Sequence, residues 1–259
     1  MINLYEAFLL SMVISGILIL VFLFFKNAGY GQFFSKNWGL KVNNKVGWIV
    51  MELPVVIVYI ILWLFSKHPG EIVPIIFSLV FLTHYIQRTF IFPLLIRGND
   101  PMPWSIIAMG MIFNTANAFM QGIWIFYLAP ENYYSVSWST SPQFIIGVIW
   151  FFFGFIVNLN ADHIIRNLRP KSDSGPGTFH IPRGGVFDLF KITCANYFGE
   201  FMEWCGFGLM IFSWSGLIFA FWTFANLGPR AHAIRKFYEE KFGDEFKKLK
   251  RKRMIPLIY

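Results

Sequence analysis

Seven apolar segments, separated by more polar stretches, constrain this chain more than any other feature of its sequence. A helix needs about 20 mainly apolar residues to cross the hydrocarbon core of a bilayer. The candidate segments are 4–25, 46–66, 72–95, 103–128, 143–165, 192–212 and 215–229. Only 14% of the residues are charged, whereas soluble domains carry about 25%. The sequence therefore predicts an all-α, polytopic membrane protein with seven transmembrane helices in a single integral membrane domain, residues 1–259.

Lysine and arginine are concentrated in alternate connecting segments. Segments 26–45 and 166–191 are basic, 129–142 contains neither residue, and ten of the 22 Lys and Arg lie between Arg230 and Arg253. Because basic loops tend to face the cytoplasm, this alternation predicts an N-terminus outside and a cytoplasmic C-terminus. The net charge of +8 therefore indicates contact with anionic headgroups of the lipid bilayer and no nucleic acid partner. We expect a multi-pass protein of a bacterial inner membrane or, in a eukaryote, of the endoplasmic reticulum.

Two segments carry polar residues in stripes at helical spacing. The first stripe consists of Asn158, Asp162, Arg166 and Arg169, at i, i+4, i+8 and i+11. The second consists of Asn196, Glu200 and Glu203, at i, i+4 and i+7. Each spacing places the side chains on one helix face, and ionisable residues inside a span usually mark a functional site. For the first stripe, an ordinary ion pair between Asp162 and Arg166 near a helix end is the alternative.

Further cations follow the last apolar segment, where Arg230, Arg235 and Tyr238 occur. Together with the two stripes they would form a pocket rich in cations and amides at the cytoplasmic side. Arginine binds phosphate in bidentate geometry, so a phosphorylated nucleotide cofactor is a natural ligand, and an anionic lipid headgroup is the alternative. The sequence has no GxGxxG after a strand and no GxxxxGK[ST], so the nucleotide would not be held by a Rossmann or P-loop site. Segment 170–185, rich in Pro, Gly and Ser, predicts an irregular loop between the stripes.

The N-terminal half has two polar islands within apolar segments. Glu52 lies two residues before Pro54, whose missing N–H loosens a helix, and His84, Tyr85 and Arg88 lie close together in the third segment. A buried glutamic acid beside a tyrosine hydroxyl can polarise a carbonyl oxygen, or protonate it as negative charge develops. A structural polar network that braces the bundle is the alternative.

Metal chemistry has little support in the sequence. The five histidines are scattered and form no HExxH motif. The two cysteines, Cys194 and Cys205, are too few for a disulfide framework or a thiolate metal site. We therefore expect no metal cofactor.

Several short motifs occur together in this chain. They are MELP (51–54), HYIQRTF (84–90), LNADHIIRNLR (159–169), IPRGG (181–185), ANYFGEFMEWCG (195–206), LGPRAH (227–232), KFYEEKF (236–242) and RKRMIPLIY (251–259). As a set they resemble the steroid 5α-reductase family, most densely over 158–259 and less densely over 48–103. The resemblance implies a seven-span enzyme that uses NADPH to reduce the carbon–carbon double bond of a 3-oxo-Δ4 steroid. Related branches act on polyprenols and on 2,3-enoyl-CoA thioesters.

The resemblance also implies roles for individual residues. Glu52 and Tyr85 would be catalytic, because they match residues that bind the ketone oxygen and stabilise the enolate formed when hydride reaches the β carbon. The positions that match cofactor-binding residues of the family are Asn158, Asp162, Arg169, Asn196, Glu200, Arg230 and Tyr238. Trp48 and Trp204 match aromatic residues that line the steroid slot.

Four other candidates depart from the family's pattern or match it less firmly. Met51 stands where the family often has Gln before Glu-Leu-Pro, and we retain it as a substrate-binding candidate. His180 replaces the Arg of a Tyr-Arg-Ile-Pro motif, Arg235 lies where the family has a His-rich run, and Arg166 shares the stripe of Asp162. We count Arg166, His180 and Arg235 among the cofactor-binding candidates.

These observations lead to one interpretation and three alternatives. The interpretation is a monomeric NADPH-dependent oxidoreductase acting on CH–CH bonds of an apolar, steroid-like substrate. Residues 48–103 would form its substrate and catalytic half, and 143–259 its NADPH-binding half, including a cytoplasmic loop at 166–191 and a basic tail at 230–259. The alternatives are a reductase of polyprenol or 2,3-enoyl-CoA, a lipid-binding scaffold, and a membrane methyltransferase. The last of these would use S-adenosylmethionine, and FYEEKFGDEF (237–246) also resembles methyltransferases of the isoprenylcysteine type.

Overall fold

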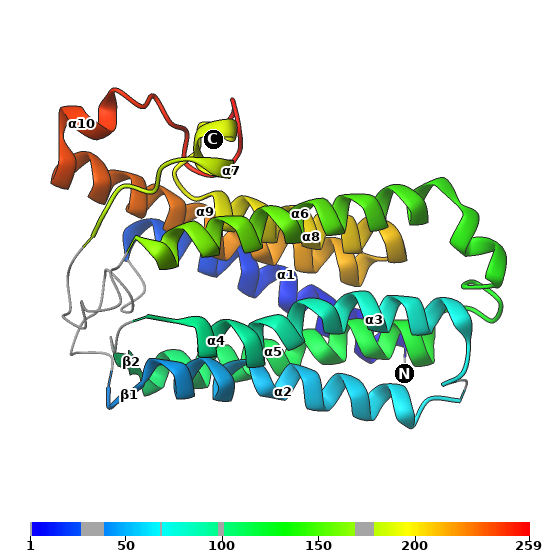
Figure 1. Ribbon diagram of the computed structural model, residues 1–259. Coiled ribbons are helices and arrows are strands. Elements are labelled where there is room, and N and C mark those ends of the chain that lie inside the picture. The colour runs from blue at the N-terminus through cyan, green and yellow to red at the C-terminus, as the bar shows by residue number, and fades with distance from the viewer. Residues whose placement is uncertain (1, 27–38, 68, 98–100, 169–178) are drawn as a thin grey trace.

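Long helices that run back and forth along one axis make up most of the protein (Figure 1). The computed structural model describes residues 2–26, 39–67, 69–97, 101–168 and 179–259. The long helical segments are α1 (Ile2–Phe25), α2 (Asn44–Leu64), α3 (Ile72–Ile86) with the π-helix η3 (Gln87–Ile91) and α4 (Phe92–Leu95), α5 (Trp104–Ile123) with the π-helix η4 (Trp124–Leu128), α6 (Pro142–Asn167), α8 (Ala195–Ile211) and α9 (Trp214–Phe242). Each position predicted from an apolar segment is therefore occupied by a long helix, and the predicted helical fold is confirmed apart from one short pair of strands.

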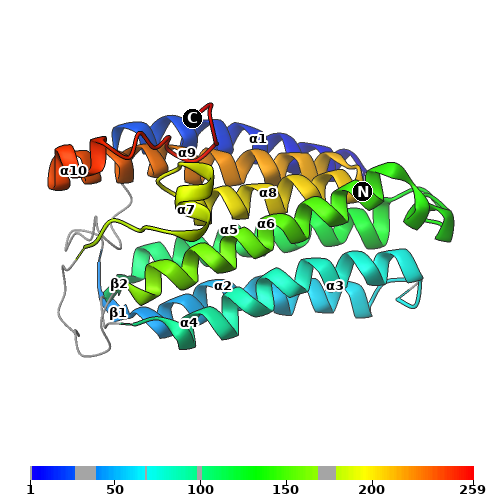
Figure 2. The same ribbon diagram turned by 45° about the horizontal axis from the view of Figure 1, so that its top comes forward.

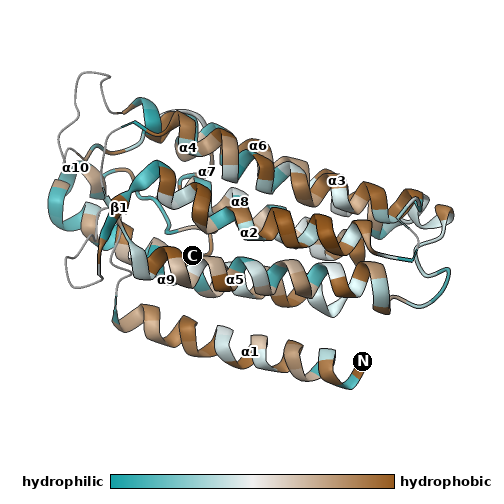
Figure 3. Ribbon diagram, turned by 90° about the horizontal axis from the view of Figure 1, so that it is seen from below, coloured by the Kyte–Doolittle hydropathy of each residue, from teal (hydrophilic) through white to brown (hydrophobic). Residues whose placement is uncertain are grey.

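Within the described residues, five helical segments are long and apolar enough to cross a membrane. They are Ile2–Phe25, Asn44–Leu64, Ile72–Leu95, Trp104–Leu128 and Pro142–Asn167. α8 has only 17 residues and contains Glu200 and Glu203, and α9 becomes polar after Arg230. Seven spans are therefore not confirmed, and the orientation of the termini stays a prediction. Figure 3 shows hydrophobic residues along the long helices and hydrophilic residues gathered at the end with α10 (Asp244–Lys247) and β1 (Lys41–Asn43).

The long helices form two layers (Figures 1 and 2). One layer contains α2, α3, α4 and α5, and the other contains α1, α6, α8 and α9. The first helix packs mainly on α9 and not on α2, its neighbour in sequence. Trp222 Nε1 donates a hydrogen bond to the Met12 carbonyl at 2.6 Å, and Gly16 leaves room for the Trp222 ring. The first long helix therefore packs beside the last one (Figure 1), and its beginning reaches the other layer, where the Tyr5 hydroxyl donates to the Met120 carbonyl of α5 at 2.7 Å.

Glycines let α6 and α8 approach each other backbone to backbone. The facing glycines are Gly147 and Gly154 on α6 and Gly199 and Gly206 on α8. A Cβ atom added to Gly154 would lie 2.5 Å from both the Glu203 nitrogen and the Gly199 carbonyl oxygen. Small residues allow such close crossings in membrane bundles. This packing brings the polar stripe of α6 against that of α8.

Short elements organise the end of the bundle that carries α10, which we call the α10 end. Here β1 pairs antiparallel with β2 (Pro101–Pro103), and the short helix α7 (Gly185–Phe190) precedes α8. Asn43 begins α2, because its side-chain oxygen accepts from the backbone N–H groups of Lys45 and Val46 at 3.0 and 3.4 Å. The 3-10 helix η5 (Val136–Thr140) lies at the opposite end (Figure 1).

Arg251 attaches the C-terminal tail to the segment before α8. Its Nη1 donates to the Pro182 carbonyl at 2.7 Å, and its Nη2 donates to Asp188 Oδ1 at 2.5 Å. Burial works to raise the pKa of Asp188, but a hydrogen bond from the Gly184 N–H and the Arg251 guanidinium outweigh it, so this pKa lies below its ordinary value. The tail therefore forms part of the folded α10 end.

The structure tests only part of the irregular loop predicted at 170–185. Residues 179–184 form no regular secondary structure, as predicted, whereas 170–178 lie outside the described residues. The helix α7 follows immediately and was not predicted. Its first turn is closed by the Gly184 N–H, which donates to Asp188 Oδ2 at 2.6 Å. Gly184 has φ of 79°, a conformation that glycine adopts without steric cost.

Candidate active site

Arg88 lies in a buried polar cluster that connects the two layers. The residue is 9% exposed and stands on η3. Its Nη1 donates to Asp162 Oδ2 at 3.1 Å, and its Nη2 lies 3.5 Å from Glu200 Oε2. The guanidinium carbon lies 4.9 Å from the centre of the Trp48 ring and 4.4 Å from that of Phe92. A single cation thus joins α2, η3 and the facing stripes of α6 and α8.

The π-helical turn that carries Arg88 has a local cause. Pro93 has no N–H to donate to the Thr89 carbonyl four residues earlier. The Phe92 N–H instead donates to the Gln87 carbonyl, five residues back. Such wide turns inside helices are frequent at functional sites.

His84 and Tyr85 form a second contact between the layers. His84 Nδ1 and Glu203 Oε2 are 2.7 Å apart, and both side chains are buried. The ring of Trp204 on α8 lies 4.7 Å from that of His84 and 5.5 Å from that of Tyr85. Glu203 Oε1 is buried and has no hydrogen-bond partner among the described residues. The third span is therefore held directly against the polar stripe of α8.

Both catalytic candidates are hydrogen-bonded to amides of α5. Asn114 Nδ2 donates to Glu52 Oε2 at 2.9 Å, and Asn117 Nδ2 donates to the Tyr85 hydroxyl oxygen at 2.7 Å. Residues three apart lie on the same face of a helix. Glu52 is 8% exposed and Tyr85 is 3% exposed. The structure thus brings these two residues, 33 positions apart in sequence, to one face of α5.

Four of the cofactor-binding candidates belong to the buried cluster: Asn158, Asp162, Asn196 and Glu200. Asp162 and Glu200 contact Arg88 as described above. Asn158 is 3% exposed, and its Nδ2 donates to the Asn196 backbone carbonyl at 3.0 Å. The two stripes predicted on separate segments therefore meet in space.

Of three further candidates, Arg166 and His180 do not join this cluster within the part of the chain that the structure describes, and the third is not described. Arg166 contacts its own helix, because its Nη2 lies 3.0 Å from His163 Nδ1. His180 is exposed at the α10 end. Arg169 lies outside the described residues.

The α9 candidates extend away from the buried cluster along their helix. The guanidinium carbon of Arg230 lies 5.5 Å from the centre of the Tyr197 ring on α8. Farther along, Arg235 Nε donates to Glu239 Oε1 at 2.9 Å, and Tyr238 is buried in a small hydrophobic cluster. Arg230 is therefore the α9 candidate with a contact to α8.

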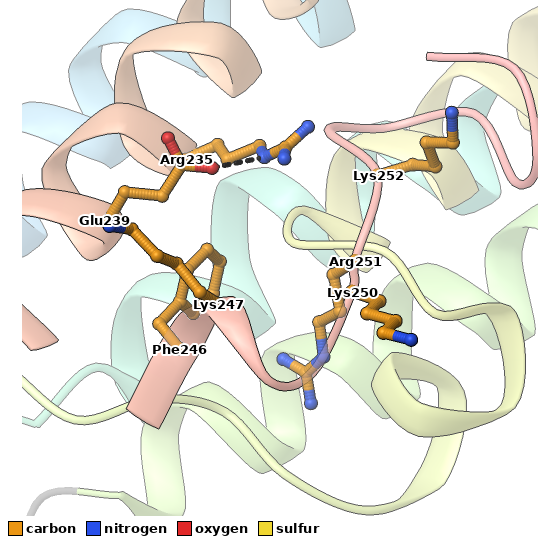
Figure 4. Close-up of a pocket in the computed structure, with 7 residues that line it drawn as sticks. All are labelled: Arg235, Glu239, Phe246, Lys247, Lys250, Arg251 and Lys252. Atoms are coloured by element: carbon orange, nitrogen blue, oxygen red, sulfur yellow. Dashed lines mark hydrogen bonds and ion pairs between the residues drawn. The ribbon is translucent and has the colours of Figure 1, made fainter. Parts of the chain in front are cut away.

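A cavity of about 370 Å³ opens beside Arg235 and is lined mainly by cations (Figure 4). Its lining residues are Arg235, Glu239, Phe246, Lys247, Lys250, Arg251 and Lys252. In Figure 4, Arg235 reaches from α9 toward the tail that carries Lys250 and Lys252. Arg235 and Arg251 are each paired with a carboxylate, so the lysines supply most of the positive charge of this cavity. The cavity could hold an anion.

The three substrate-binding candidates differ in their surroundings. Trp48 packs edge-on against Phe92, with ring centres 5.1 Å apart. Trp204 is 1% exposed and lies among the rings of α3, α8 and α9. Met51 is turned toward α5, where a Cβ atom added to Gly110 would overlap its side chain. The two tryptophans therefore border the polar cluster, whereas Met51 fills a contact between helices.

The sequence-based prediction missed the amide face of α5 and the connecting role of Arg88. Asn114, Asn117 and Gln121 are spaced i, i+3 and i+7, which is the same signal that identified the stripes of α6 and α8. The partners of Arg88 lie 74 and 112 residues away in sequence, so no local pattern could identify them.

Acids, amides and an arginine enclosed between layers of apolar helices define a polytopic membrane protein with an internal polar site. Within the described residues, no group of three or more His, Cys, Asp and Glu side chains could hold a metal ion.

Comparison with known proteins identifies the family. The chain matches the family model described as 3-oxo-5-alpha-steroid 4-dehydrogenase over residues 100–259. It is 37% identical over 235 residues to 3-oxo-5-alpha-steroid 4-dehydrogenase 1 of Homo sapiens, covering 90% of this chain and 87% of the relative. It is 34% identical over 257 residues to steroid 5-alpha-reductase DET2 of Arabidopsis thaliana, covering 97% and 95%. The chain therefore belongs to the 3-oxo-5-alpha-steroid 4-dehydrogenase family, as its motifs indicated. Members of this family are oxidoreductases that act on a CH–CH bond, and so is this enzyme.

Proposed function

We propose that this enzyme reduces the carbon–carbon double bond of a 3-oxo-Δ4 steroid, as a monomer and with NADPH as the hydride donor. Its relatives are named for steroid substrates and align with nearly all of the chain. The observation that carries the proposal is the hydrogen bonding of Glu52 and Tyr85 to neighbouring amides of α5. Two oxygen acids held on the same face of α5 support a shared role in binding one ketone oxygen.

The catalytic task of Glu52 and Tyr85 is to stabilise negative charge on the ketone oxygen. NADPH, when bound, supplies the hydride that reaches the β carbon of the enone. As charge develops on the ketone oxygen, the Tyr85 hydroxyl and the protonated Glu52 carboxyl each donate a hydrogen bond to it. A preorganised donor aimed at a developing oxyanion is worth about 10²–10³ in kcat. The apolar helices around the site exclude water and so strengthen both hydrogen bonds.

The residues of α6, α8 and α9 fit a dinucleotide. Carboxylates and amides of the buried cluster, such as Glu200 and Asn158, suit hydroxyl and carboxamide groups. Cations farther along α9, such as Arg235, suit phosphates. The rise of about 1.5 Å per residue places Tyr238 about 12 Å along α9 from Arg230, so this helix can follow an extended cofactor. In this arrangement Arg166 and His180 contribute at the α10 end, and Trp48, Met51 and Trp204 border the substrate. Arg169, which lies outside the described residues, would also bind the cofactor.

We place the α10 end at the cytoplasmic face. β1, α7 and α10 lie together at this end (Figure 1), and their segments contain Lys41, Lys191 and Lys247. The positive-inside rule assigns such an end to the cytoplasm, which is where NADPH would enter. The apolar substrate reaches the site from the bilayer.

Two substitutions test the proposal directly. Glu52→Gln and Tyr85→Phe should each lower the rate of NADPH consumption with a 3-oxo-Δ4 steroid by about 10²–10³, with little change in the unfolding temperature. Tyr127→Phe is the matched control, because it removes a hydroxyl that donates to the Leu62 carbonyl at 3.0 Å and has no part in the proposed site. Wild-type turnover in both Glu52→Gln and Tyr85→Phe would refute the proposal.

Ligand binding separates the proposed reductase from the other classes. NADPH should raise the unfolding temperature of the wild-type enzyme, and S-adenosylmethionine should not. Stabilisation by S-adenosylmethionine alone would support a methyltransferase, and stabilisation by neither would support a scaffold. Product analysis with steroid, polyprenol and enoyl thioester substrates then identifies the substrate class.

A further inference from the structure

The amide face of α5, formed by Asn114, Asn117 and Gln121, is a buried polar feature to which the proposed reaction gives no task. Asn114 is 5% exposed, and Asn117 and Gln121 are fully buried at 0%. Buried amides are costly unless they are hydrogen-bonded. These amides make two sets of contacts. Asn114 contacts α2 and Glu52, whereas Asn117 and Gln121 connect Tyr85 to the beginning of α9.

One backbone carbonyl in each set fixes which way its hydrogen bonds run. A carbonyl oxygen can only accept, so an amide group that meets one must present its nitrogen. Asn114 meets the Met51 carbonyl at 2.9 Å, and Gln121 meets the Ser215 carbonyl at 3.1 Å. The orientation of both amide groups follows from these two contacts.

The orientations of these amides determine which atoms of the catalytic candidates accept hydrogen bonds. Because the Asn114 nitrogen also faces Glu52, the Oε2 atom of Glu52 must accept, at 2.9 Å. Because the Gln121 nitrogen faces Asn117, the Oδ1 atom of Asn117 accepts, at 3.2 Å. The nitrogen of Asn117 is therefore the atom that faces Tyr85, and the tyrosine oxygen accepts at 2.7 Å.

We infer that Asn114 and Asn117 are positioning residues for Glu52 and Tyr85. Because each amide donates a hydrogen bond from α5, Glu52 and Tyr85 accept on that side and direct their acidic hydrogens toward the substrate carbonyl. The inference rests on the proposed function. With Oε2 accepting from Asn114, the proton of a neutral Glu52 lies on Oε1. With its oxygen accepting from Asn117, the Tyr85 hydroxyl turns its hydrogen away from α5. Each donated N–H also stabilises charge that spreads onto the acid as the ketone oxygen becomes negative.

Reversing one hydrogen bond separates this directing role from a structural one. In Asn117→Asp the introduced carboxylate has nearly the same shape, but it can only accept. It keeps the hydrogen bond from Gln121 and takes the Tyr85 hydrogen away from the substrate. Asn117→Leu removes the hydrogen bond and leaves Tyr85 free to rotate. We expect kcat to fall more in Asn117→Asp than in Asn117→Leu, with a loss of about 10²–10³ in the former and smaller changes in KM.

A structural role would give the opposite order, because Asn117→Asp retains contacts with Tyr85 and Gln121 that Asn117→Leu loses. The pH dependence of Asn117→Asp gives a second signature. Its kcat should rise relative to wild type as the pH is lowered and the introduced carboxyl gains a proton to donate. Asn132→Asp, in an exposed turn at the opposite end of the bundle, is the control for the same chemical change and should match the wild type at every pH.

The Glu52 side is tested with Asn114→Leu, which should lower kcat while the protein still binds NADPH with wild-type affinity. Unfolding temperatures of all variants identify any that fail to fold. The inference is overturned if kcat is higher in Asn117→Asp than in Asn117→Leu and does not rise at low pH. In that case Glu52→Gln and Tyr85→Phe would still be impaired, so the proposed function would stand. If those two variants are themselves fully active, the proposed function fails, and the inference fails with it.

Discussion

Adding one methyl group between α6 and α8 should destabilise the protein more than the same change elsewhere in a helix. In Gly154→Ala the new carbon would lie 2.5 Å from the Glu203 nitrogen and the Gly199 carbonyl oxygen, roughly 1 Å closer than an ordinary contact. Both neighbours are backbone atoms, so a side-chain rotation cannot relieve the overlap. The two helices must separate, and overpacking of this kind costs about 1–3 kcal/mol.

Gly47→Ala is the matched control for this change. Gly47 also lies within a helix, so both variants gain the same helix propensity of about 1 kcal/mol over glycine. The three atoms nearest to its added Cβ all belong to side chains: Ile107 Cδ1 and Met102 Sδ at 3.1 Å and Met102 Cβ at 3.3 Å. A small shift of these side chains relieves the contacts without separating two backbones. The difference between the two variants therefore isolates the cost of separating α6 from α8.

Thermal unfolding in detergent micelles, followed by tryptophan fluorescence, measures this difference. A domain of this size loses about 2–4 °C per kcal/mol, so Gly154→Ala should unfold about 2–12 °C below Gly47→Ala. Activity should fall as well, because the shift moves Glu200 away from Arg88, from which it is 3.5 Å distant. Equal unfolding temperatures for the two variants would refute the close-packing argument.

Three further predictions follow from the buried and surface charges. Arg88→Met should lower the stability by about 3–5 kcal/mol because it leaves buried carboxylates unpaired; adding Asp162→Asn should restore part of the unfolding temperature, and no recovery would contradict the pairing. Because the pKa of Asp188 lies below its ordinary value, its carboxylate stabilises the fold above that value and the effect is lost as the pH falls through the folded pKa. The small advantage of wild type over Asp188→Asn should therefore be full at neutral pH and decline as the pH falls below the ordinary value of 3.8, and an advantage independent of pH would argue against this. Arg251→Met should release the tail and accelerate its cleavage by trypsin, with little change in the unfolding temperature of the bundle; an unchanged cleavage rate would mean that the contacts of Arg251 do not hold the tail.

The positions of the long helices were predictable because burial in lipid imposes a length and a composition on each segment. Membrane crossing is harder to predict for α8 and α9. α8 contains Glu200 and Glu203, and it is largely covered by α6 and α9, so its composition reflects protein neighbours more than lipid. α9 continues past its apolar part to Phe242, and this extension carries the cations of the α10 end.

The candidate site was predictable only where its residues form a local pattern. The stripes containing Asp162 and Glu200 follow the helical repeat and were found. Their meeting with Arg88 was not, since that depends on packing between segments 74 and 112 residues apart. The backbone contacts that fix the direction of Asn114 and Asn117 are likewise tertiary, and a sequence carries no sign of which atom of an amide faces its neighbour.

The packing of α1 on α9 has a consequence for how the enzyme is made. Met12 and Trp222, which are joined by a hydrogen bond, are 210 residues apart. Domains form in the order of synthesis, and contacts between distant segments form late. The first helix therefore waits among lipids until nearly all of the chain has been translated, and only then gains its main partner. An insertion intermediate that lacks α9 would hold α1 as a loosely attached helix, and this is the stage at which membrane quality control would have most access to the nascent enzyme.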